Sequence, residues 1–434
     1  MNLFDALCRK FEDRTVVCGV VGLGYVGLPL AVEFARAGLK VAGFDVTAGK
    51  VDMLNRGESY IQDVPTSIVA GHVNNGLLSA TTDFSRLAEV DTINICVPTP
   101  LRKTKDPDMS FIVAAAEQIA RHLRPGTLII LESTTYPGTT DELLLPMFEK
   151  SGLRCGKDFF LCFSPERVDP GNPKFQTYNI PKVVGGITAD CTELGRRFYA
   201  LSLETVVPVA STSVAEMVKL LENTFRMINI GLVNELALMC NRMGINVWEV
   251  IDAAATKPFG FMPFYPGPGL GGHCIPIDPF YLSWKTRQAG IEARFIELAG
   301  YINGQMPHFV VDKIQAALND AAKPVKGSRV HILGVAYKKN IDDVRESPAL
   351  DIIHLLKSRG AIVSYSDSHI PDLSHEGLDE KAIDTAQGCR AADCVVIVTD
   401  HKDFDYPSVI EQSRLIVDTR NATKGLSSSK IVRL

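Results

Sequence analysis

The sequence of 434 residues predicts an α/β protein with a parallel β-sheet near each end of the chain and an all-helical segment between the two sheets. Short apolar runs rich in β-branched residues alternate with helical patterns before residue 210, and this alternation returns after residue 323. Between these regions, a helical pattern continues for about thirty residues without proline. We therefore expect three domains, over residues 1–210, 211–322 and 323–434.

The first domain has a Rossmann-like layout. Its expected strands cover residues 16–21, 41–44, 92–97 and 127–131. The first strand leads into Gly22-Leu23-Gly24-Tyr25-Val26-Gly27 and a helix expected over residues 28–36, which is the arrangement that holds a pyrophosphate at a helix N-terminus. Gly22 and Gly24 permit the tight turn, and Gly27 permits close packing of helix on strand. Asp45 ends the second strand, where a carboxylate accepts ribose hydroxyls and repels the extra phosphate of NADP, so the pattern predicts NAD.

Small polar residues follow two later strands of this domain. Pro98 and Thr99 follow one strand, and Ser133 and Thr134 follow the next. Ligands of open α/β sheets lie outside the carboxyl ends of the strands, so these residues are candidates for the nicotinamide side of the site. The alternative interpretation is ordinary turn chemistry.

The middle domain is predicted to contain a long helix that ends near Gly244. Ser213 and Glu216 have the spacing of a capping box at its start. Glu216, Lys219, Asn223 and Arg226 fall on one stripe of this helix. A stripe of this kind is often a solvated face, but the apolar neighbours of Lys219 and Asn223 favour burial and an anion-stabilising role for Lys219.

Cys274 is the strongest candidate for chemistry in the chain. It lies in a loop of glycines and prolines, Gly-Pro-Gly-Leu-Gly-Gly-His-Cys-Ile-Pro-Ile-Asp-Pro, over Gly267–Pro279. Glycines let the backbone approach a ligand closely, so the thiol is placed to act as a covalent nucleophile. Because the chain has ten cysteines, the alternative is that Cys274 is a small, partly buried apolar residue.

The third domain repeats the alternation of strand and helix but lacks a GxGxxG turn. Its expected strands cover residues 329–333, 362–365, 394–398 and 415–417, and Ser347 with Pro348 predicts the start of a helix. A nucleotide-type fold without the pyrophosphate turn suggests a mononucleotide-linked ligand. Lys338, Arg345 and Arg420 are candidates for binding phosphate, and ordinary surface charge is the alternative for each.

Composition narrows the class of protein further. A formal net charge of -5 without a basic block argues against nucleic-acid binding. Residues 1–14 lack the apolar core of a signal peptide, and no apolar run reaches the roughly 20 residues of a membrane span. The cysteines form no CxxC pair, which disfavours a zinc site. We expect a cytoplasmic protein with reduced thiols, no metal and no membrane partner.

Six blocks, in order along nearly the whole chain, together resemble the UDP-sugar 6-dehydrogenase family: Gly22–Gly27, Glu132–Thr140, Ser164–Asn172, Lys219–Asn223, Gly267–Pro279 and Ala336–Pro348. Within that family, the stretch Asp252–Tyr281 is most similar to UDP-N-acetylglucosamine 6-dehydrogenases. The resemblance implies an NAD-dependent, four-electron oxidation of a C6 alcohol to a carboxylate, in two steps. It also implies a UDP-sugar substrate, a homodimer or higher homo-oligomer, and a place in polysaccharide biosynthesis such as that of O-antigen.

The family correspondence implies roles for individual residues. Cys274 would be the nucleophile that holds the aldehyde, Lys219 and Asn223 would stabilise the oxyanion, and Thr134, Glu166 and Asp278 would hold and deprotonate water. Residues expected to contact the cofactor are Gly22, Gly24, Tyr25, Val26, Gly27, Asp45, Lys50, Pro98, Thr99, Ser133, Thr134 and Arg345. Residues expected to contact the substrate are Glu166, Arg167, Lys219, Asn223, Leu270, Gly271, Lys338 and Arg420.

Several alternatives stay open at this point. Asp278 before Pro279 has the pattern of a helix N-cap, and Glu166 after Ser164-Pro165 that of a first-turn acid. His273 is interpreted as structural or substrate-lining, because neighbouring side chains on an extended loop point apart. The alternative activities are a UDP-glucose or UDP-N-acetylmannosamine 6-dehydrogenase and a 6-phosphogluconate-type dehydrogenase, and a non-enzymatic nucleotide-sugar-binding module is the third class.

Overall fold

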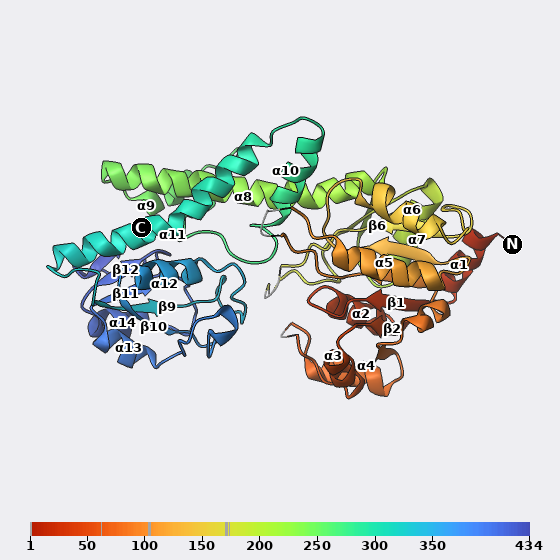
Figure 1. Ribbon diagram of the computed structural model, residues 1–434, viewed down its shortest axis with the longest axis horizontal. Coiled ribbons are helices and arrows are strands. Elements are labelled where there is room, and N and C mark those ends of the chain that lie inside the picture. The colour runs from red at the N-terminus through yellow and green to blue at the C-terminus, as the bar shows by residue number, and fades with distance from the viewer. Residues whose placement is uncertain (1, 62, 103–105, 170–171, 173) are drawn as a thin grey trace. The chain divides into compact units, whose positions relative to one another are not determined.

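The computed structural model describes residues 2–61, 63–102, 106–169, 172 and 174–434. The chain divides into two compact units. The N-terminal unit runs to Glu222 and also includes Trp284–Gly290, and the C-terminal unit comprises Asn223–Ser283 and Ile291–Leu434. Figure 1 shows a sheet flanked by helices in each unit, which confirms the predicted α/β class.

The N-terminal unit is built on an eight-stranded sheet with the order β3-β2-β1-β4-β5-β6-β7-β8. Neighbouring strands are parallel except for β6 and β7. The strands are β1 (Val17–Val21), β2 (Lys40–Phe44), β3 (Leu78–Thr81), β4 (Thr92–Ile95), β5 (Leu128–Leu131), β6 (Phe160–Phe163), β7 (Lys182–Gly186) and β8 (Val206–Pro208). The four strands expected from the sequence are confirmed as β1, β2, β4 and β5.

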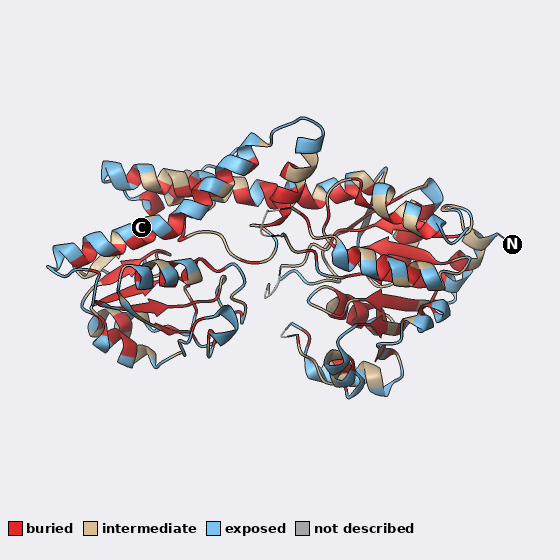
Figure 2. Ribbon diagram, viewed as in Figure 1, coloured by how far each residue is buried: buried red, intermediate tan, exposed pale blue. Residues whose placement is uncertain are grey.

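Both faces of this sheet are covered. Along β5, Leu128 and Ile130 belong to one apolar core, while Ile129 and Leu131 belong to another, as expected when successive side chains point to opposite faces. The central strands β4, β5 and β6 are accordingly buried, and Figure 2 shows the buried residues of the sheet in red, whereas the edge strand β8 is largely exposed. The helical elements of the unit are α1 (Leu3–Glu12), α2 (Gly27–Arg36), α3 (Ala48–Asn55), α4 (Thr66–Asn74), η1 (Phe84–Glu89), α5 (Ser110–His122), η2 (Thr139–Leu144), α6 (Leu145–Glu149) and α7 (Ala189–Tyr199).

The strand order places a ligand crevice in the N-terminal unit. From β1 the chain proceeds outward to β2 and β3, and it then returns to the other side of β1 as β4. At such a reversal the loops after the two central strands separate and leave a crevice at their carboxyl ends. The Gly22–Gly27 turn leaves β1 at this edge and leads directly into α2.

A single long helix, α8 (Thr212–Met243), confirms the predicted helix of the middle domain, but its start differs from the prediction. Ser211, not Ser213, caps the helix, because the Ser211 Oγ accepts the backbone N–H of Val214 at 3.2 Å. The Ser213 hydroxyl instead donates to Asp141. The carboxylate of Glu216 accepts the N–H groups of Gly138 and Thr140, so it does not close a capping box.

The polar stripe on α8 is buried over only part of the predicted length. Glu216, Lys219 and Asn223 are buried, which excludes a solvated face for these three residues. Arg226 is exposed and departs from the pattern. It lies ten positions after Glu216, where the stripe has already drifted around the helix axis.

Three further helices follow α8: α9 (Val247–Ala254), α10 (Asp278–Gln288) and α11 (Arg294–Asp320). In the C-terminal unit, Gly231 of α8 lies against Ala299 of α11, where an added Cβ would come within 3.1 Å of the alanine methyl. The buried amide of Asn234 donates to Asn303 at 2.8 Å in the same interface. A glycine and a paired amide therefore let α8 and α11 approach closely.

The second sheet lies in the C-terminal unit and has five parallel strands in the order β10-β9-β11-β12-β13. Its elements are β9 (Arg329–Leu333), α12 (Pro348–Ser358), β10 (Ile362–Ser366), η3 (Ser374–Glu376), α13 (Thr385–Ala391), β11 (Cys394–Ile397), α14 (Tyr406–Gln412), β12 (Ile416–Asp418) and β13 (Ile431–Arg433). The four predicted strands are confirmed. Ser347 caps α12 as predicted, with its side chain accepting the N–H of Ala349.

Candidate functional site

The turn between β1 and α2 has the geometry of a pyrophosphate-binding loop. Gly22 has φ +90°, and a Cβ there would lie 2.7 Å from the carbonyl oxygen of Cys96. A Cβ on Gly27 would collide with the carbonyl oxygen of Gly22. Gly24 has no atom within 4 Å of the position its Cβ would take, so the backbone there is open to a ligand. Each glycine thus serves the purpose that its place in the motif predicts.

Asp45 is held at the end of β2 by backbone hydrogen bonds. Its buried carboxylate accepts the N–H groups of Leu23 and Thr47, each at 2.9 Å. Lys50 lies 3.8 Å from the same carboxylate. Tyr60, which the sequence did not single out, donates its hydroxyl to the Leu23 carbonyl at 2.8 Å. The open Gly24 backbone and the fixed carboxylate fit the pyrophosphate and adenosine ribose of NAD.

Among the residues that follow β4 and β5, which were predicted either to line the nicotinamide side of the site or to form ordinary turns, Ser133 makes a turn contact. The Ser133 hydroxyl donates to the Val97 carbonyl at 2.7 Å, which is turn chemistry. Thr99 is buried, and Thr134 is half-buried. Pro98 is exposed in the same loop. Near the turn, Tyr25 is 49% exposed, and Val26 is the residue immediately before α2.

A buried charged cluster lies behind these strand ends. The Lys182 ammonium at the start of β7 is 2.6 Å from Glu132, which follows β5, and 3.2 Å from Glu166, which follows β6. Glu132 also accepts hydrogen bonds from the Tyr199 hydroxyl and from the Asn94 amide. We call Glu132, Lys182 and Glu166 the buried triad. Lys182 was missed from the sequence, although a lysine that opens an otherwise apolar strand was the available signal.

Glu166 is held as an anion. Burial opposes ionisation, but the Lys182 ammonium, the N–H groups of Val168 and Arg167, and the nearby Lys219 charge outweigh it, so the pKa of Glu166 lies below its usual range. One oxygen accepts the N–H of Arg167 at 2.7 Å and that of Val168 at 2.8 Å, while the other faces Lys182. The carboxylate is therefore a fixed charge and a poor proton acceptor at neutral pH.

The predicted helical context of Glu166 is wrong. Residues 164–169 are irregular after β6, so no helix dipole acts on this carboxylate. A Ser-Pro-Glu sequence resembles a helix start, but the backbone N–H groups of Arg167 and Val168 turn back onto the Glu166 side chain instead. Pro170 and Gly171, in the matching block Ser164–Asn172, lie outside the described residues.

Arg167 and Lys219 occupy different environments in the N-terminal unit. The Arg167 guanidinium pairs with Glu222 at 2.6 Å and donates to the Pro181 carbonyl at 2.7 Å. Lys219 is only 8% exposed, and its charge acts on Glu166. The prediction that Lys219 is buried is confirmed.

In the C-terminal unit, Cys274 is exposed at the end of a tightly packed glycine loop. An added Cβ at Gly267 would lie 2.6 Å from the guanidinium of Arg420, and one at Gly271 would lie 2.8 Å from the Glu346 carbonyl oxygen. The N–H of Gly272 donates to the Arg345 carbonyl at 2.9 Å. The glycines are needed because the loop packs against other backbone and side chains, in addition to any need for flexibility.

Cys274 is linked to Asp278 and Asn223. The Cys274 carbonyl accepts the N–H of Asp278 at 2.8 Å, and the Asn223 amide donates to the Asp278 carboxylate at 2.5 Å. Both Asp278 and Asn223 are buried. Helix α10 begins at Asp278 itself, so this residue belongs to the first turn and the N-cap prediction is wrong by one position. The structure thus brings together three residues that the sequence predicts to be catalytic.

The remaining loop residues have less distinctive surroundings. His273 and Leu270 are both half-buried. Burial, followed by the positive charge of Arg345, lowers the pKa of His273. A neutral imidazole next to the thiol fits a structural or substrate-lining role better than that of an ion-pair partner.

The predicted cations of the third domain also have different environments. Arg420 follows β12 and donates from Nε to the Val398 carbonyl at 2.8 Å, and burial lowers its pKa. Arg345 pairs with Asp343 at 2.6 Å. Lys338 is half-buried in the segment after β9. Arg420 lies beside Gly267 of the cysteine loop through its guanidinium, and Arg345 contacts Gly272 of that loop through its backbone carbonyl.

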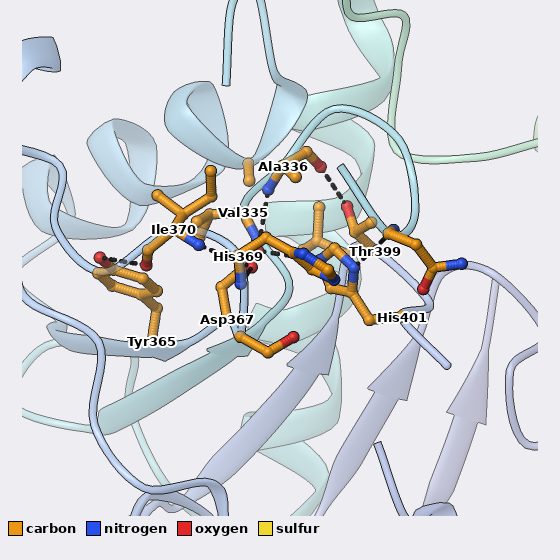
Figure 3. Close-up of polar contacts among 12 residues, drawn as sticks. Val335, Ala336, Tyr365, Asp367, His369, Ile370, Thr399 and His401 are labelled. Atoms are coloured by element: carbon orange, nitrogen blue, oxygen red, sulfur yellow. Dashed lines mark hydrogen bonds and ion pairs between the residues drawn. The ribbon is translucent and has the colours of Figure 1, made fainter. Parts of the chain in front are cut away.

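The turn after β9 in the C-terminal sheet corresponds in position to the Gly22–Gly27 turn after β1, and Figure 3 shows the polar contacts around it. Asp367 follows β10 as Asp45 follows β2, and its carboxylate accepts the N–H groups of Val335, at 2.7 Å, and Ala336, at 3.1 Å. His401 is buried and lies 2.9 Å from the same carboxylate. Helix α12 begins only at Pro348, so its N-terminus does not follow this turn directly. The N–H groups of Val335 and Ala336 are therefore engaged by Asp367, and the N-terminus of α12 does not provide donors directly after β9 as that of α2 does after β1.

Metal-binding clusters and membrane-spanning helices are both absent from the described residues. No group of three or more His, Cys, Asp or Glu side chains in that part of the chain is placed to hold a metal ion. None of its helices combines the length and the apolar character needed to cross a membrane.

Comparison with known proteins adds a consistent set of similarities. Family models described as UDP-glucose/GDP-mannose dehydrogenase match in three parts: the NAD binding domain over residues 16–202, the central domain over 213–305 and the UDP binding domain over 331–425. The UDP-N-acetyl-D-mannosamine dehydrogenase of Salmonella typhimurium is 38% identical over 421 residues, 92% of this chain and 97% of that protein.

Two further related proteins are named for N-acetylated UDP-sugars. The UDP-N-acetyl-D-glucosamine 6-dehydrogenase of Pseudomonas aeruginosa is 37% identical over 389 residues, 89% of this chain and 90% of that protein. The solved structure of a UDP-D-ManNAc dehydrogenase from Pyrococcus horikoshii has a TM-score of 0.88 at 32% identity, and the match covers 96% of this chain and 98% of that one.

Proposed function

Because the chain belongs to the UDP-glucose/GDP-mannose dehydrogenase family and is therefore an NAD-dependent dehydrogenase of a UDP-sugar, we propose that it oxidises C6 of a UDP-N-acetylhexosamine to a carboxylate. The exposed thiol of Cys274, one helical turn before Asp278, is the observation that carries the proposal. A thiol at this place supplies what an oxidation beyond the aldehyde requires, namely a covalent hold on the aldehyde carbon. Family membership leaves no role for the 6-phosphogluconate-type or non-enzymatic alternatives.

We propose that Cys274 holds the carbon skeleton covalently between two hydride transfers. C6 of the alcohol loses a hydride and a proton and becomes an aldehyde, and the Cys274 sulfur adds to it as a thiohemiacetal. Loss of a second hydride and proton leaves a thioester, which water hydrolyses to the carboxylate and the restored thiol. Bound NAD supplies the hydride-accepting chemistry, and Gly24, Asp45 and Thr99 are the residues that we propose to hold it.

Roles for the polar residues follow from their surroundings. The Asn223 amide, which is fixed by Asp278, is proposed to stabilise the oxyanion at C6 together with the buried Lys219 ammonium. Asp278 is proposed to deprotonate the hydrolytic water, and Thr134 to hold it. Glu166 is proposed as a fixed charge that orients water or substrate, because both of its oxygens already accept hydrogen bonds.

We propose Arg420 and Lys338 as partners of the substrate diphosphate. Arg420 lies against Gly267 at the start of the cysteine loop, which also carries Leu270 and Gly271, and its guanidinium suits an anionic oxygen. The packing of that loop supports the proposal that one segment holds both the nucleotide and the reacting end of the sugar. Arg345 supports the loop through its carbonyl and is kept as a cofactor candidate from the family resemblance.

The sugar is proposed to be UDP-N-acetylglucosamine, on the resemblance of Asp252–Tyr281, with UDP-N-acetylmannosamine as the second candidate. The second candidate is favoured by the relative at 38% identity and by the Pyrococcus structure. The test is a panel of UDP-glucose and the UDP-N-acetyl derivatives of glucosamine, mannosamine and galactosamine, followed by NADH absorbance and product mass. Two NADH per uronate from an N-acetylhexosamine is expected. If UDP-glucose alone were oxidised, the proposed substrate class would be wrong.

An oligomer is also part of the proposal. Exposed apolar side chains occur along α8 at spacings of four and seven residues, which is the pattern of a helix that packs against another helix: Met217, Leu221, Phe225, Leu232, Met239 and Met243. We propose that a second copy of the chain covers this stripe. A cytoplasmic location and a role in supplying uronates for surface polysaccharide such as O-antigen complete the proposed function.

A further inference from the structure

Three cysteine thiols from different elements lie together in the N-terminal unit, away from the proposed chemistry. Cys155 belongs to the turn before β6, Cys162 to β6 and Cys191 to the first turn of α7. The sulfur atoms of Cys155 and Cys191 are 4.0 Å apart. The Cys162 thiol points to the Cys191 carbonyl oxygen at 3.0 Å. Cys155 and Cys191 are therefore the pair whose sulfur atoms face each other.

The two sulfur atoms of this pair differ in environment. The sulfur of Cys191 accepts hydrogen bonds from the Thr188 hydroxyl at 3.1 Å and from the N–H of Leu161 at 3.4 Å. The hydrogen bond from Cys155, followed by those from Thr188 and Leu161, lowers the pKa of Cys191 to about 6 although burial opposes this. Cys191 is fully buried, whereas Cys155 is half-buried. The hydrogen bond to Cys191 and burial raise the pKa of Cys155, so Cys155 holds the proton that the pair shares. Cys155 is thus the more accessible sulfur, and Cys191 the better-stabilised thiolate.

The segment that carries Cys155 is open on one side of the cysteine and packed on the other. No side chain or backbone atom lies within 4 Å of the Cβ position of Gly152, whereas a Cβ on Gly156 would lie 2.8 Å from the Thr188 side chain. Closing the sulfur pair from 4.0 Å to a bond of about 2.05 Å requires a shift of roughly 2 Å. A surface turn accommodates this shift more readily than the buried start of α7.

We propose that Cys155 and Cys191 form a reversible disulfide when the protein is exposed to hydrogen peroxide. The Cys155 thiol passes the proton that it shares with Cys191 to the Cys191 sulfur and attacks one oxygen of the peroxide. The O–O bond breaks, the leaving hydroxide takes the proton back from Cys191, and Cys155 sulfenic acid and one water result. The Cys191 thiolate then attacks the Cys155 sulfur, forms the S–S bond and releases the second oxygen as water. Two thiols lose two hydrogens in total, one peroxide becomes two waters, and a dithiol reductant reverses the bond.

The experiment exposes the full-length protein to hydrogen peroxide, blocks the remaining thiols by alkylation and maps the linked peptides by mass spectrometry without reduction. A peptide pair joining Cys155 to Cys191, lighter by two hydrogens and separated by dithiothreitol, is expected. The mapping uses wild-type protein, so it does not depend on whether a variant folds.

Two variants and one matched control identify the reacting atoms. Cys155→Ser and Cys191→Ser should each lose the linked pair, while Cys162→Ser, a change to the adjacent thiol, should retain it. A peptide pair joining Cys155 to Cys162, or Cys155 found only as sulfinic acid, would overturn the proposal, as would unreacted thiols at both positions. The readout does not involve the sugar, NAD or Cys274, so its result is independent of the proposed function.

Discussion

At the scale of single residues, the proposed chemistry depends most on the Cys274 sulfur. We expect Cys274→Ser to lower uronate formation by at least about 10³-fold, since removal of a covalent nucleophile typically costs this much or more. NAD binding should persist, because Gly24, Asp45 and Thr99, which we propose to hold the cofactor, belong to the N-terminal unit and Cys274 to the C-terminal unit. Quenched-reaction assay of the uronate, with NAD titration by fluorescence, measures both effects. Cys155→Ser is the control, and a Cys274→Ser protein with near-normal turnover would contradict the covalent mechanism.

The buried triad makes a second prediction at this scale. Lys182→Met removes the cation from between two buried carboxylates, which should destabilise the fold by about 3–5 kcal/mol. The pKa of Glu166 should rise, because Lys182 is the main group that favours its ionised form, while the backbone N–H groups and Lys219 remain. The acidic limb of the kcat/KM profile should then move to higher pH.

The Lys182 experiment combines urea unfolding with pH–rate profiles. Lys182→Arg keeps the charge and should keep the pH profile. If Lys182→Met folds poorly, a second change of Glu132→Gln should restore stability by removing one of the unpaired anions. A pH profile unchanged in Lys182→Met would show that this lysine does not set the charge state of Glu166.

At the scale of the element, the start of α8 depends on the protonation of Glu216. Burial raises the pKa of this carboxyl from an ordinary 4.5 to about 7, although hydrogen bonds from Thr140 and Gly138 oppose the rise and Asp141 adds to it. The folded state therefore holds the proton more tightly than the unfolded chain does. Its contribution to stability is complete below pH 4.5 and is lost as pH rises to about 7.

The measurement compares wild type with Glu216→Gln, whose side chain does not titrate. Between pH 4.5 and 7 the free energy of unfolding of wild type should fall relative to that of the variant, by an amount on the order of 2 kcal/mol. Chemical denaturation at a series of pH values gives the difference. A constant difference over this range would mean that Glu216 ionises normally in the fold.

The elements also show which features could be predicted from sequence. Strands β1, β9 and β11 are runs of apolar, β-branched residues, and their own composition predicts them. Strand β3, Leu78–Thr81, is short and alternates buried with exposed residues, so it lacks such a signal. The start of α8 was misplaced because the partners of Glu216 lie more than 70 positions away in the chain.

Among the site residues, too, those in local motifs could be predicted from the sequence, and those whose partners lie far along the chain could not. Asp45 and Cys274 lie in local motifs whose spacing indicates their chemistry. The role of Lys182 arises only when β5, β6 and β7 bring Glu132 and Glu166 to it, a proximity that no local pattern encodes. The glycines of the cysteine loop were predicted to be flexible, whereas their tight packing against Tyr337 and Arg420 depends on the third domain.

At the scale of the whole molecule, the exposed stripe on α8 predicts self-association. Leu221 is 61% exposed and Leu232 is 60% exposed, and leaving such side chains in water costs free energy that a second copy would recover. We expect wild type to sediment as a dimer or larger species, and Leu221→Glu with Leu232→Glu to shift it to monomer. Ile362→Glu, at an exposed position on β10, is the matched control. A wild-type monomer at micromolar concentration would contradict the proposed oligomer.

The turn after β1, beside Asp45, and the turn after β9, beside Asp367, differ in a way that determines how many NAD molecules one chain can bind. In the first turn, Asp45 accepts the N–H of Leu23, and the backbone at Gly24 beyond it is open; in the second turn, Asp367 accepts the N–H groups of both Val335 and Ala336. A phosphate anion that used these two donors in the second turn would have to displace the Asp367 carboxylate from them. Calorimetric titration with NAD should therefore saturate at one cofactor per chain, and the two hydride transfers that we propose for each turnover would then use successive cofactors at one place.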